Sequence, residues 1–187
     1  LKQSKHRIVC VYTQPPKKKS RGQKILKTAV HSFSENEGIE VRTNKLSDKK
    51  EYEEFTKLKT DIVIVVAYGQ IIPEKYLNIP NLIFLNVHAS LLPKWRGAAP
   101  IERAILNKEI ETGVSIMKIE KKLDSGPFIK QIKVKINKET TSEELIKKLS
   151  IIGAEALKDS IEQVSLGKAV FKEQNEKEAT YAKKIDK

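Results

Sequence analysis

Apolar positions follow two kinds of pattern along the chain, and together they predict an open α/β sheet. Segment 62–67 is an unbroken apolar run rich in β-branched side chains, which is typical of a strand covered on both faces. Segments 82–87 and 113–119 have the same character, so all three predict parallel strands. Between such runs, apolar positions recur every three or four residues, as on one face of a helix. Strands that alternate with helices are typical of α/β folds.

The other elements are predicted from shorter patterns and from their end signals. Gly38 suits the residue that closes a helix, and Thr141 with Glu144 forms a capping box. The predicted strands are 8–12, 39–41 and 128–136, and the predicted helices are 25–37 and those that begin near Asp48, Pro100 and Thr141.

Composition places limits on the class of protein. The 187 residues suffice for one domain with a sizeable core. The single cysteine excludes an intramolecular disulfide and a cysteine-cluster metal site, and three scattered histidines make us expect no metal. The longest apolar run is too short to cross a bilayer, so we expect a cytoplasmic protein.

The net charge of +12 is concentrated near the start of the chain. Residues 2–24 include eight Lys and Arg residues and no acidic residue. Such a segment favours a polyanionic partner such as nucleic acid. We expect segment 15–24 to be an exposed, irregular loop that becomes ordered on RNA, because its cations repel one another.

One predicted strand end carries residues suited to chemistry. Asn86 and His88 are two positions apart, so they share a face of strand 82–87. An amide can donate to an oxygen that becomes negative, and an imidazole can carry a proton. His88 could instead only satisfy a backbone carbonyl. Asp124, in a tight turn, could face His88 or cap its own turn. Nucleotide-binding and hydrolase-elbow motifs are missing from the sequence.

The segment that follows is unusually rich in large apolar residues for a loop. Leu91, Leu92 and Trp95 have no helical or strand period. They could line a ligand, or they could pack in an ordinary surface turn.

These residues together resemble a known family. Residues 86–101, Asn-Val-His-Ala-Ser-Leu-Leu-Pro-Lys-Trp-Arg-Gly-Ala-Ala-Pro-Ile, closely resemble the signature of the folate-dependent formyltransferases that act on methionyl-tRNA. Supporting similarities lie at 66–73, 111–117, 123–126, 12–24 and 180–185. The resemblance implies a Rossmann-like open, mostly parallel sheet of the formyltransferase type. It also implies that 1–170 is the catalytic domain without its first strand–helix unit, and that 171–187 begins the linker to a C-terminal barrel.

The resemblance assigns roles to particular residues. The catalytic residues would be Asn86, His88 and Asp124. The reduced-folate site would include Ser90, Leu91, Leu92 and Pro93, with 68–73 as a further wall. The tRNA-binding residues would be Arg21, Lys17, Lys18, Lys19 and Lys24.

The implied reaction is formyl transfer from the co-substrate 10-formyltetrahydrofolate to the α-amino group of initiator methionyl-tRNA, without a metal. Asn86 and protonated His88 would stabilise the tetrahedral oxyanion, and Asp124 would hold His88 and relay the proton. The protein would act as a monomer with no membrane partner. One alternative keeps the chemistry but uses a small amine, on a sugar nucleotide or glycinamide ribonucleotide. Another is a non-catalytic RNA-binding protein, which would leave Asn86, His88 and Asp124 without a role.

Overall fold

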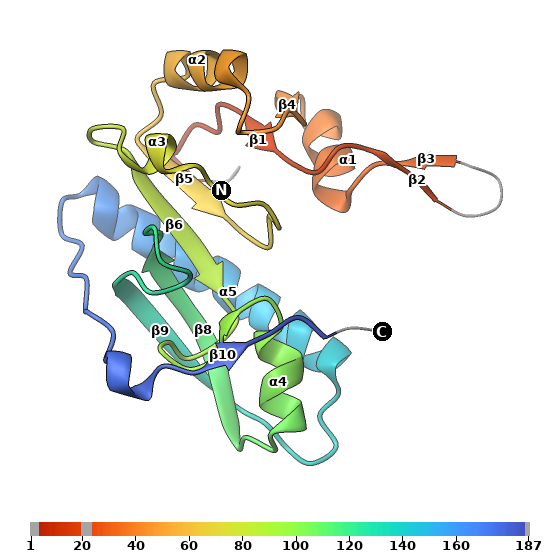
Figure 1. Ribbon diagram of the computed structural model, residues 1–187, viewed down its shortest axis with the longest axis vertical. Coiled ribbons are helices and arrows are strands. Elements are labelled where there is room, and N and C mark those ends of the chain that lie inside the picture. The colour runs from red at the N-terminus through yellow and green to blue at the C-terminus, as the bar shows by residue number, and fades with distance from the viewer. Residues whose placement is uncertain (1–3, 20–23, 186–187) are drawn as a thin grey trace. The chain divides into compact units, whose positions relative to one another are not determined.

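The computed structural model describes residues 4–19 and 24–185. They fall into two compact units (Figure 1). Unit 1 is drawn from 1–61 and 68–80, and unit 2 from 62–67 and 81–187. All three candidate catalytic residues belong to unit 2.

Unit 1 contains a short parallel pair of strands, β1 (Val11–Tyr12) and β4 (Val41–Arg42). Its helices are α1 (Ala29–Asn36), α2 (Lys49–Lys57) and α3 (Glu74–Leu77). Asp48 caps α2 as predicted, because its side chain accepts the backbone N–H of Lys50. The rings of Phe55 and Tyr76 pack edge to face, 4.9 Å apart, and form part of the apolar interior of this unit.

The basic segment differs from its prediction. β2 (Lys17–Lys19) and β3 (Lys24–Leu26) pair as an antiparallel ribbon, so an irregular loop is wrong for these residues. Backbone N–H and C=O groups can pair whatever charge the side chains carry. α1 therefore begins later than predicted, at Ala29, where Thr28 accepts the backbone N–H of His31.

Unit 2 is built on a four-stranded sheet in the order β5–β6–β8–β9. The strands are β5 (Ile62–Val65), β6 (Ile83–His88), β8 (Glu111–Lys118) and β9 (Phe128–Lys135). β5 and β6 are parallel, as predicted. β8 is antiparallel to both neighbours, so its predicted parallel direction is wrong. A largely apolar segment indicates burial on both faces, which a central strand has in either direction.

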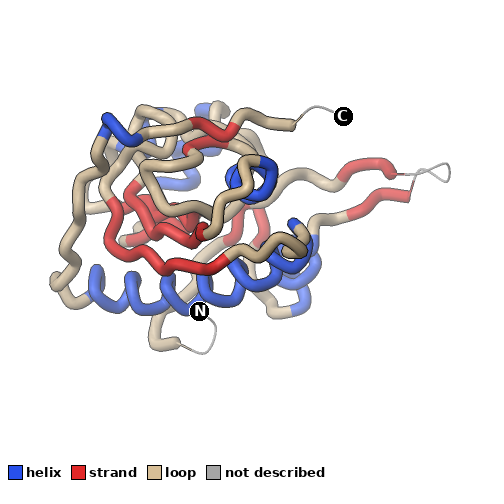
Figure 2. Tube along the Cα trace, turned by 90° about the horizontal axis from the view of Figure 1, so that it is seen from below, coloured by secondary structure: helices blue, strands red, loops and turns tan. Residues whose placement is uncertain are grey.

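Helix α5 (Ser142–Ser165) packs on β8 and β9 and is the long helix that runs along the strands in Figure 2. The predicted capping box is present, with Thr141 and Glu144 each bonded to the other's backbone. Leu145, Leu149 and Ala156 are buried on the inner face of the helix. A second helix, α4 (Pro100–Leu106), has Pro100 in its first turn, as predicted.

The last part of the chain also belongs to unit 2. Lys172 pairs with Phe128, a 3-10 turn η1 (Glu176–Glu178) follows, and β10 (Tyr181–Ala182) lies parallel to β7 (Arg96–Gly97). Residues 172–182, expected to begin a linker, are thus paired with the middle of the chain. In the described part of the chain, no helix has both the length and the apolar character that crossing a membrane requires.

Candidate active site

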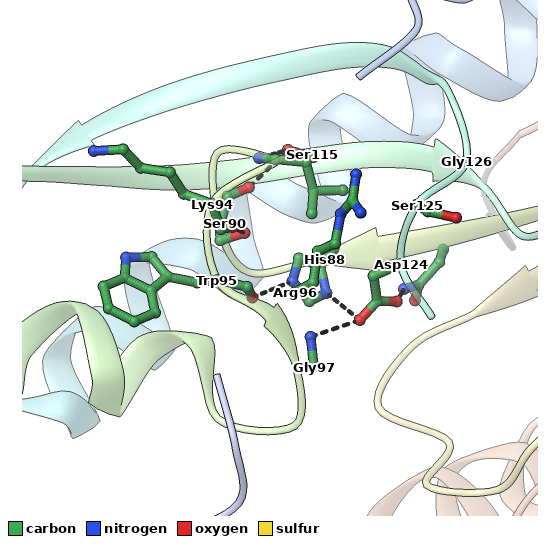
Figure 3. Close-up of polar contacts among 12 residues, drawn as sticks. His88, Ser90, Lys94, Trp95, Arg96, Gly97, Ser115, Asp124, Ser125 and Gly126 are labelled. Carbon is green, nitrogen blue, oxygen red and sulfur yellow. Dashed lines mark hydrogen bonds and ion pairs between the residues drawn. The ribbon is translucent and has the colours of Figure 1, made fainter. Parts of the chain in front are cut away.

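The end of β6 and the turn after β8 bring the three candidate catalytic residues together. Asn86 and His88 lie on one face of β6. Asn86 Nδ2 lies 3.5 Å from Asp124 Oδ1. His88 Nδ1 lies 3.7 Å from Asp124 Oδ2 (Figure 3). Of the two positions considered for Asp124, the structure therefore shows the one that faces His88.

The two nitrogens of His88 have different surroundings. The side chain is buried, and Nε2 lies 2.9 Å from the carbonyl oxygen of Trp95 (Figure 3). A carbonyl oxygen can only accept, so Nε2 carries a hydrogen. Nδ1 is then the atom that can take up or release a proton, and it faces the Asp124 carboxylate. His88 satisfies a backbone carbonyl and faces a carboxylate at the same time.

Asp124 is held in a constrained turn. Its φ of 46° lies in the left-handed region, which Asp tolerates better than most residues. Its Oδ2 accepts the backbone N–H of Gly97 at 2.8 Å (Figure 3). Two residues later, a Cβ on Gly126 would overlap the carbonyl oxygen of Lys118, so only glycine lets the turn lie this close to β8. The carboxylate is therefore fixed by both its own turn and the neighbouring segment.

Behind this turn lies a polar network that the sequence patterns did not predict. The side chain of Arg96 is fully buried. It donates to the Gln174 carboxamide and, through two nitrogens, to the Glu176 carboxylate. Gln174 in turn donates to the backbone of the Asp124 turn. An arginine inside a largely apolar motif is a signal that a counter-charge must exist, but the sequence does not say which residue supplies it.

The pairing shifts the ionisation of both charged groups. Hydrogen bonds from Arg96 and then Lys122 lower the pKa of Glu176 to about 2. Burial disfavours the charged form of Arg96, but the interactions with Glu176 and Tyr181 together outweigh this effect and raise the Arg96 pKa. Both groups are consequently charged at neutral pH.

The predicted folate-site residues lie in the loop after β6. The Ser90 hydroxyl donates to the carbonyl of Lys94 at 2.5 Å, and the Ser90 carbonyl accepts from Ser115 at 2.7 Å. The backbone N–H of Leu92 donates to the Ser115 hydroxyl, and the Leu92 carbonyl accepts from the side-chain amide of Gln131. The side chains of Ser90 and Leu92 are buried, which leaves the partly exposed residues of the loop to offer surface to a ligand. Among the four predicted folate-site residues, these are Leu91 and Pro93.

The predicted further wall, 68–73, belongs to unit 1. Part of it borders a cavity of about 450 Å³ within that unit. The lining residues are Gln14, Pro15, Thr43, Lys45, Leu46, Ser47, Gly69, Gln70, Ile71 and Pro73. This lining combines one lysine with several amides and hydroxyls.

Four of the five predicted tRNA-binding residues belong to the β2–β3 ribbon. Lys17, Lys18 and Lys19 belong to β2, and Lys24 belongs to β3. Lys17 is exposed. Arg21 lies outside the described residues. Within the ranges that the structure describes, no three His, Cys, Asp or Glu residues are grouped so as to hold a metal ion.

Comparison with known sequences gives a consistent family. The family described as formyl transferase matches residues 1–161. A methionyl-tRNA formyltransferase from Pelagibacter ubique is 51% identical over 182 residues, which are 96% of this chain and 59% of the relative. One from Coxiella burnetii is 44% identical over 185 residues, 98% of this chain and 59% of the relative. The chain therefore spans about three fifths of the length of these relatives.

Solved structures share the fold at lower identity. Glycinamide ribonucleotide transformylase 1 from Symbiobacterium toebii matches with a TM-score of 0.74 at 17% identity, over 90% of this chain and 81% of that chain. An N-formyltransferase from Helicobacter canadensis matches with a TM-score of 0.73 at 22% identity, over 94% and 70%. These likenesses show the fold alone, and they confirm the predicted α/β class.

Proposed function

Because the chain belongs to the formyl transferase family, we propose that it transfers a formyl group from 10-formyltetrahydrofolate to the α-amino group of methionyl-tRNA. The names of its relatives from Pelagibacter ubique and Coxiella burnetii support this acceptor. The product is initiator formylmethionyl-tRNA, which is used in translation in the cytoplasm. We assign residues 1–170 to the catalytic domain, as the resemblance implies. We add the residues up to Ala182, because β10 pairs with β7.

The observation that carries the proposal is the cluster of Asn86, His88 and Asp124, in which His88 Nδ1 lies 3.7 Å from Asp124 Oδ2. Formyl transfer to an amine needs a group that stabilises an oxyanion and groups that move a proton. An amide, an imidazole and a carboxylate within one small region supply these functions.

In the proposed reaction, the neutral amine attacks the formyl carbon. A carbon–nitrogen bond forms, and the carbonyl oxygen becomes a tetrahedral oxyanion. The bond from this carbon to the folate nitrogen then breaks. The proton that the attacking amine loses passes to the departing folate nitrogen. One carbon–nitrogen bond has replaced another, and no group is oxidised or reduced.

Each member of the cluster has a separate task. Asn86 Nδ2 donates to the oxyanion, and its 3.5 Å contact with Asp124 is long enough to be exchanged for one with substrate. Protonated His88 adds positive charge beside the oxyanion and exchanges its proton at Nδ1, because Nε2 is bonded to Trp95. Asp124 orients the imidazole and relays the proton. Oxyanion donation contributes about 100- to 1,000-fold and acid–base help about 100- to 10,000-fold in rate.

The loop after β6 fits a flat, partly apolar co-substrate such as a reduced folate. Its backbone is fixed by Ser115 and Gln131. Leu91 and Pro93 are partly exposed and offer apolar surface, so we assign them the contacts with the rings of the folate. Ser90 and Leu92 are buried, and we propose that they support the conformation of the loop.

The basic ribbon fits a phosphate backbone. The five cations Lys17, Lys18, Lys19, Arg21 and Lys24 have no acidic residue among them in the sequence. We assign them to the acceptor stem of the tRNA, where lysines act as point charges. Arg21 is assigned the specific contact, since its planar guanidinium can bond a phosphate or base edge through two donors.

The test is acceptor choice in the intact protein. Charged methionyl-tRNA, glycinamide ribonucleotide and an amino-sugar nucleotide are each offered with 10-formyltetrahydrofolate, and release of tetrahydrofolate is followed. The proposal expects turnover with methionyl-tRNA at a kcat/KM at least about 100-fold above either small amine. Turnover with a small amine only would show the alternative acceptor, and no turnover with any acceptor would contradict formyl transfer.

A further inference from the structure

We propose that Gln174 is a positioning residue for Asp124: it ties the turn that carries this carboxylate to the buried Arg96. The inference rests on the formyl-transfer function proposed above and deepens it. Gln174 lies in the segment that follows α5, 50 residues from Asp124 in the sequence. It lies too far along the chain for sequence spacing to have suggested this contact.

The carboxamide of Gln174 uses its whole hydrogen-bonding capacity in this network. Its Oε1 accepts from Arg96 Nε at 3.1 Å and from Arg96 Nη2 at 2.8 Å. Its Nε2 donates to the carbonyl of Asp124 at 2.9 Å and to that of Gly126 at 2.7 Å. The reverse orientation would place the NH₂ group against a guanidinium, which has no acceptor. Arg96 therefore fixes which way the amide points, and the amide fixes the turn.

Arg96 is itself a rigid anchor. Its side chain is fully buried and starts from β7, which is paired with β10. Glu176 binds it through two hydrogen bonds, at 2.7 and 3.2 Å, and also pairs with Lys122. Two-point binding of a guanidinium restricts its orientation as well as its position. The chain of contacts thus runs from Glu176 through Arg96 and Gln174 to the Asp124 turn.

The same anchor holds the carboxylate of Asp124 from its other side. Gly97 follows Arg96 on β7, and its backbone N–H donates to Asp124 Oδ2 at 2.8 Å. Oδ2 is also the oxygen that faces His88 Nδ1. Asp124 is therefore fixed to β7 twice, through its backbone by Gln174 and through its side chain by Gly97. Displacement of a reacting group by about 1 Å can cost on the order of 100-fold in rate.

Gln174→Glu tests the inference with almost no change in shape. The variant keeps an acceptor for Arg96 but replaces the two N–H donors with an oxygen that faces the carbonyls of Asp124 and Gly126. We expect kcat for formyl transfer to fall roughly 10- to 100-fold. We expect KM for both substrates to stay within about three-fold, because the contact acts on the reacting groups and not on binding. Gln163→Glu, the same change on an exposed residue of α5, should leave both constants unaltered.

A double variant separates positioning from general damage. If Gln174 acts through Asp124, adding Gln174→Glu to Asp124→Asn should lower kcat no further than Asp124→Asn alone. If the two changes act independently, their effects on kcat multiply, and the inference is wrong. Gln174→Met, which is uncharged, provides the same comparison should the carboxylate prevent folding.

Backbone amide exchange gives a readout that does not depend on activity. The Gly97 N–H is bonded to Asp124 Oδ2, whereas the adjacent Ala98 N–H is bonded to the carbonyl of Ala182. In Gln174→Glu, exchange should accelerate at least about ten-fold at Gly97 but not at Ala98. The inference would be overturned if Gln174→Glu left exchange at Gly97 unchanged. It would also be overturned if the wild type formylates methionyl-tRNA and Gln174→Glu has the same kcat. Faster exchange at Gly97 in a protein that does not formylate methionyl-tRNA would instead overturn the proposed function and leave the positioning contact standing.

Discussion

Arg96 and Glu176 are 80 residues apart in the sequence, and two hydrogen bonds join their side chains. The guanidinium is fully buried, whereas the Glu176 side chain is 54% exposed. The pair connects the segment after α5 to β7, the strand that also supplies the Gly97 contact to Asp124. Gln174 and Glu176 therefore contribute to the candidate active site.

The loss of stability on removal of this ion pair should depend on pH in a defined way. The pKa of Glu176 is lowered from its ordinary 4.5 to about 2 by Arg96 and Lys122. A carboxyl whose pKa is lower in the folded state stabilises the fold above the unfolded pKa, and this contribution disappears as pH falls through the folded pKa. Glu176→Gln should thus unfold at lower urea than wild type at pH 7, and the gap should narrow as pH falls from 4.5 towards 2.

Glu143→Gln is the matched control, because Glu143 pairs with Lys147 on an exposed face of α5. Its urea midpoint should stay near that of wild type throughout. A gap for Glu176→Gln that is the same at pH 7 and pH 2.5 would contradict the role of the ion pair.

Cys10 should be a poorly reactive thiol. Burial, and then the neighbouring Glu40, raise the Cys10 pKa from 9.0 to about 11. Because only the thiolate reacts, alkylation by iodoacetamide at pH 8 should be on the order of 100-fold slower than in denaturant. Glu40→Gln should speed the reaction by lowering this pKa. Peptide mass spectrometry measures the rate at this position, and equal rates in the folded and unfolded protein would disprove the prediction.

Gly113 should be hard to replace. A Cβ at this position in β8 would overlap the carbonyl oxygen of Ile132 and lie 2.5 Å from Leu91 Cδ2. Gly113→Ala should therefore cost about 1–3 kcal/mol of unfolding free energy, because two rigid strands must separate. Gly153→Ala is the comparison, since its Cβ would meet Val87 Cγ1 at 3.1 Å and alanine favours the helix. Chemical denaturation should show a smaller decrease for Gly153→Ala, and equal decreases would contradict the packing argument.

The basic ribbon should determine the salt dependence of tRNA binding. Alanine at Lys17, Lys18 and Lys19 together should weaken binding and flatten the plot of log affinity against log salt by roughly 0.7–0.9 for each phosphate that is no longer neutralised. Folate binding should not change. Alanine at Lys147, Lys148 and Lys158, which are exposed on α5, is the charge-matched control. An unaltered salt slope in the ribbon variant would show that these lysines do not contact phosphate.

Arg21→Ala should lower kcat/KM for tRNA more than any single lysine change.

Local patterns were sufficient to predict the features that depend on neighbours in the chain. Asp48 and the Thr141–Glu144 box mark helix starts where the structure has them, because capping is a matter of two to four residues. Asn86 and His88 were predicted to share a face because strand periodicity alone decides it.

Features that depend on distant residues could not be obtained in this way. Asn86 and Asp124 are 38 residues apart, so the sequence left the orientation of Asp124 open. The direction of β8 depends on the route of the chain before it, and an apolar run gives no information on that route. Gln174 and Glu176 reach Arg96 across 78 and 80 residues, so no spacing rule connects them.

The most direct test of the account is the rate of formylmethionyl-tRNA formation by the intact protein and by its His88→Ala variant. Both are given saturating 10-formyltetrahydrofolate and charged methionyl-tRNA, and circular dichroism checks that the variant is folded. We expect product with wild type and a rate lower by about 100- to 10,000-fold in the variant, because we assign proton transfer to His88. An undiminished rate in a folded His88→Ala protein would contradict it.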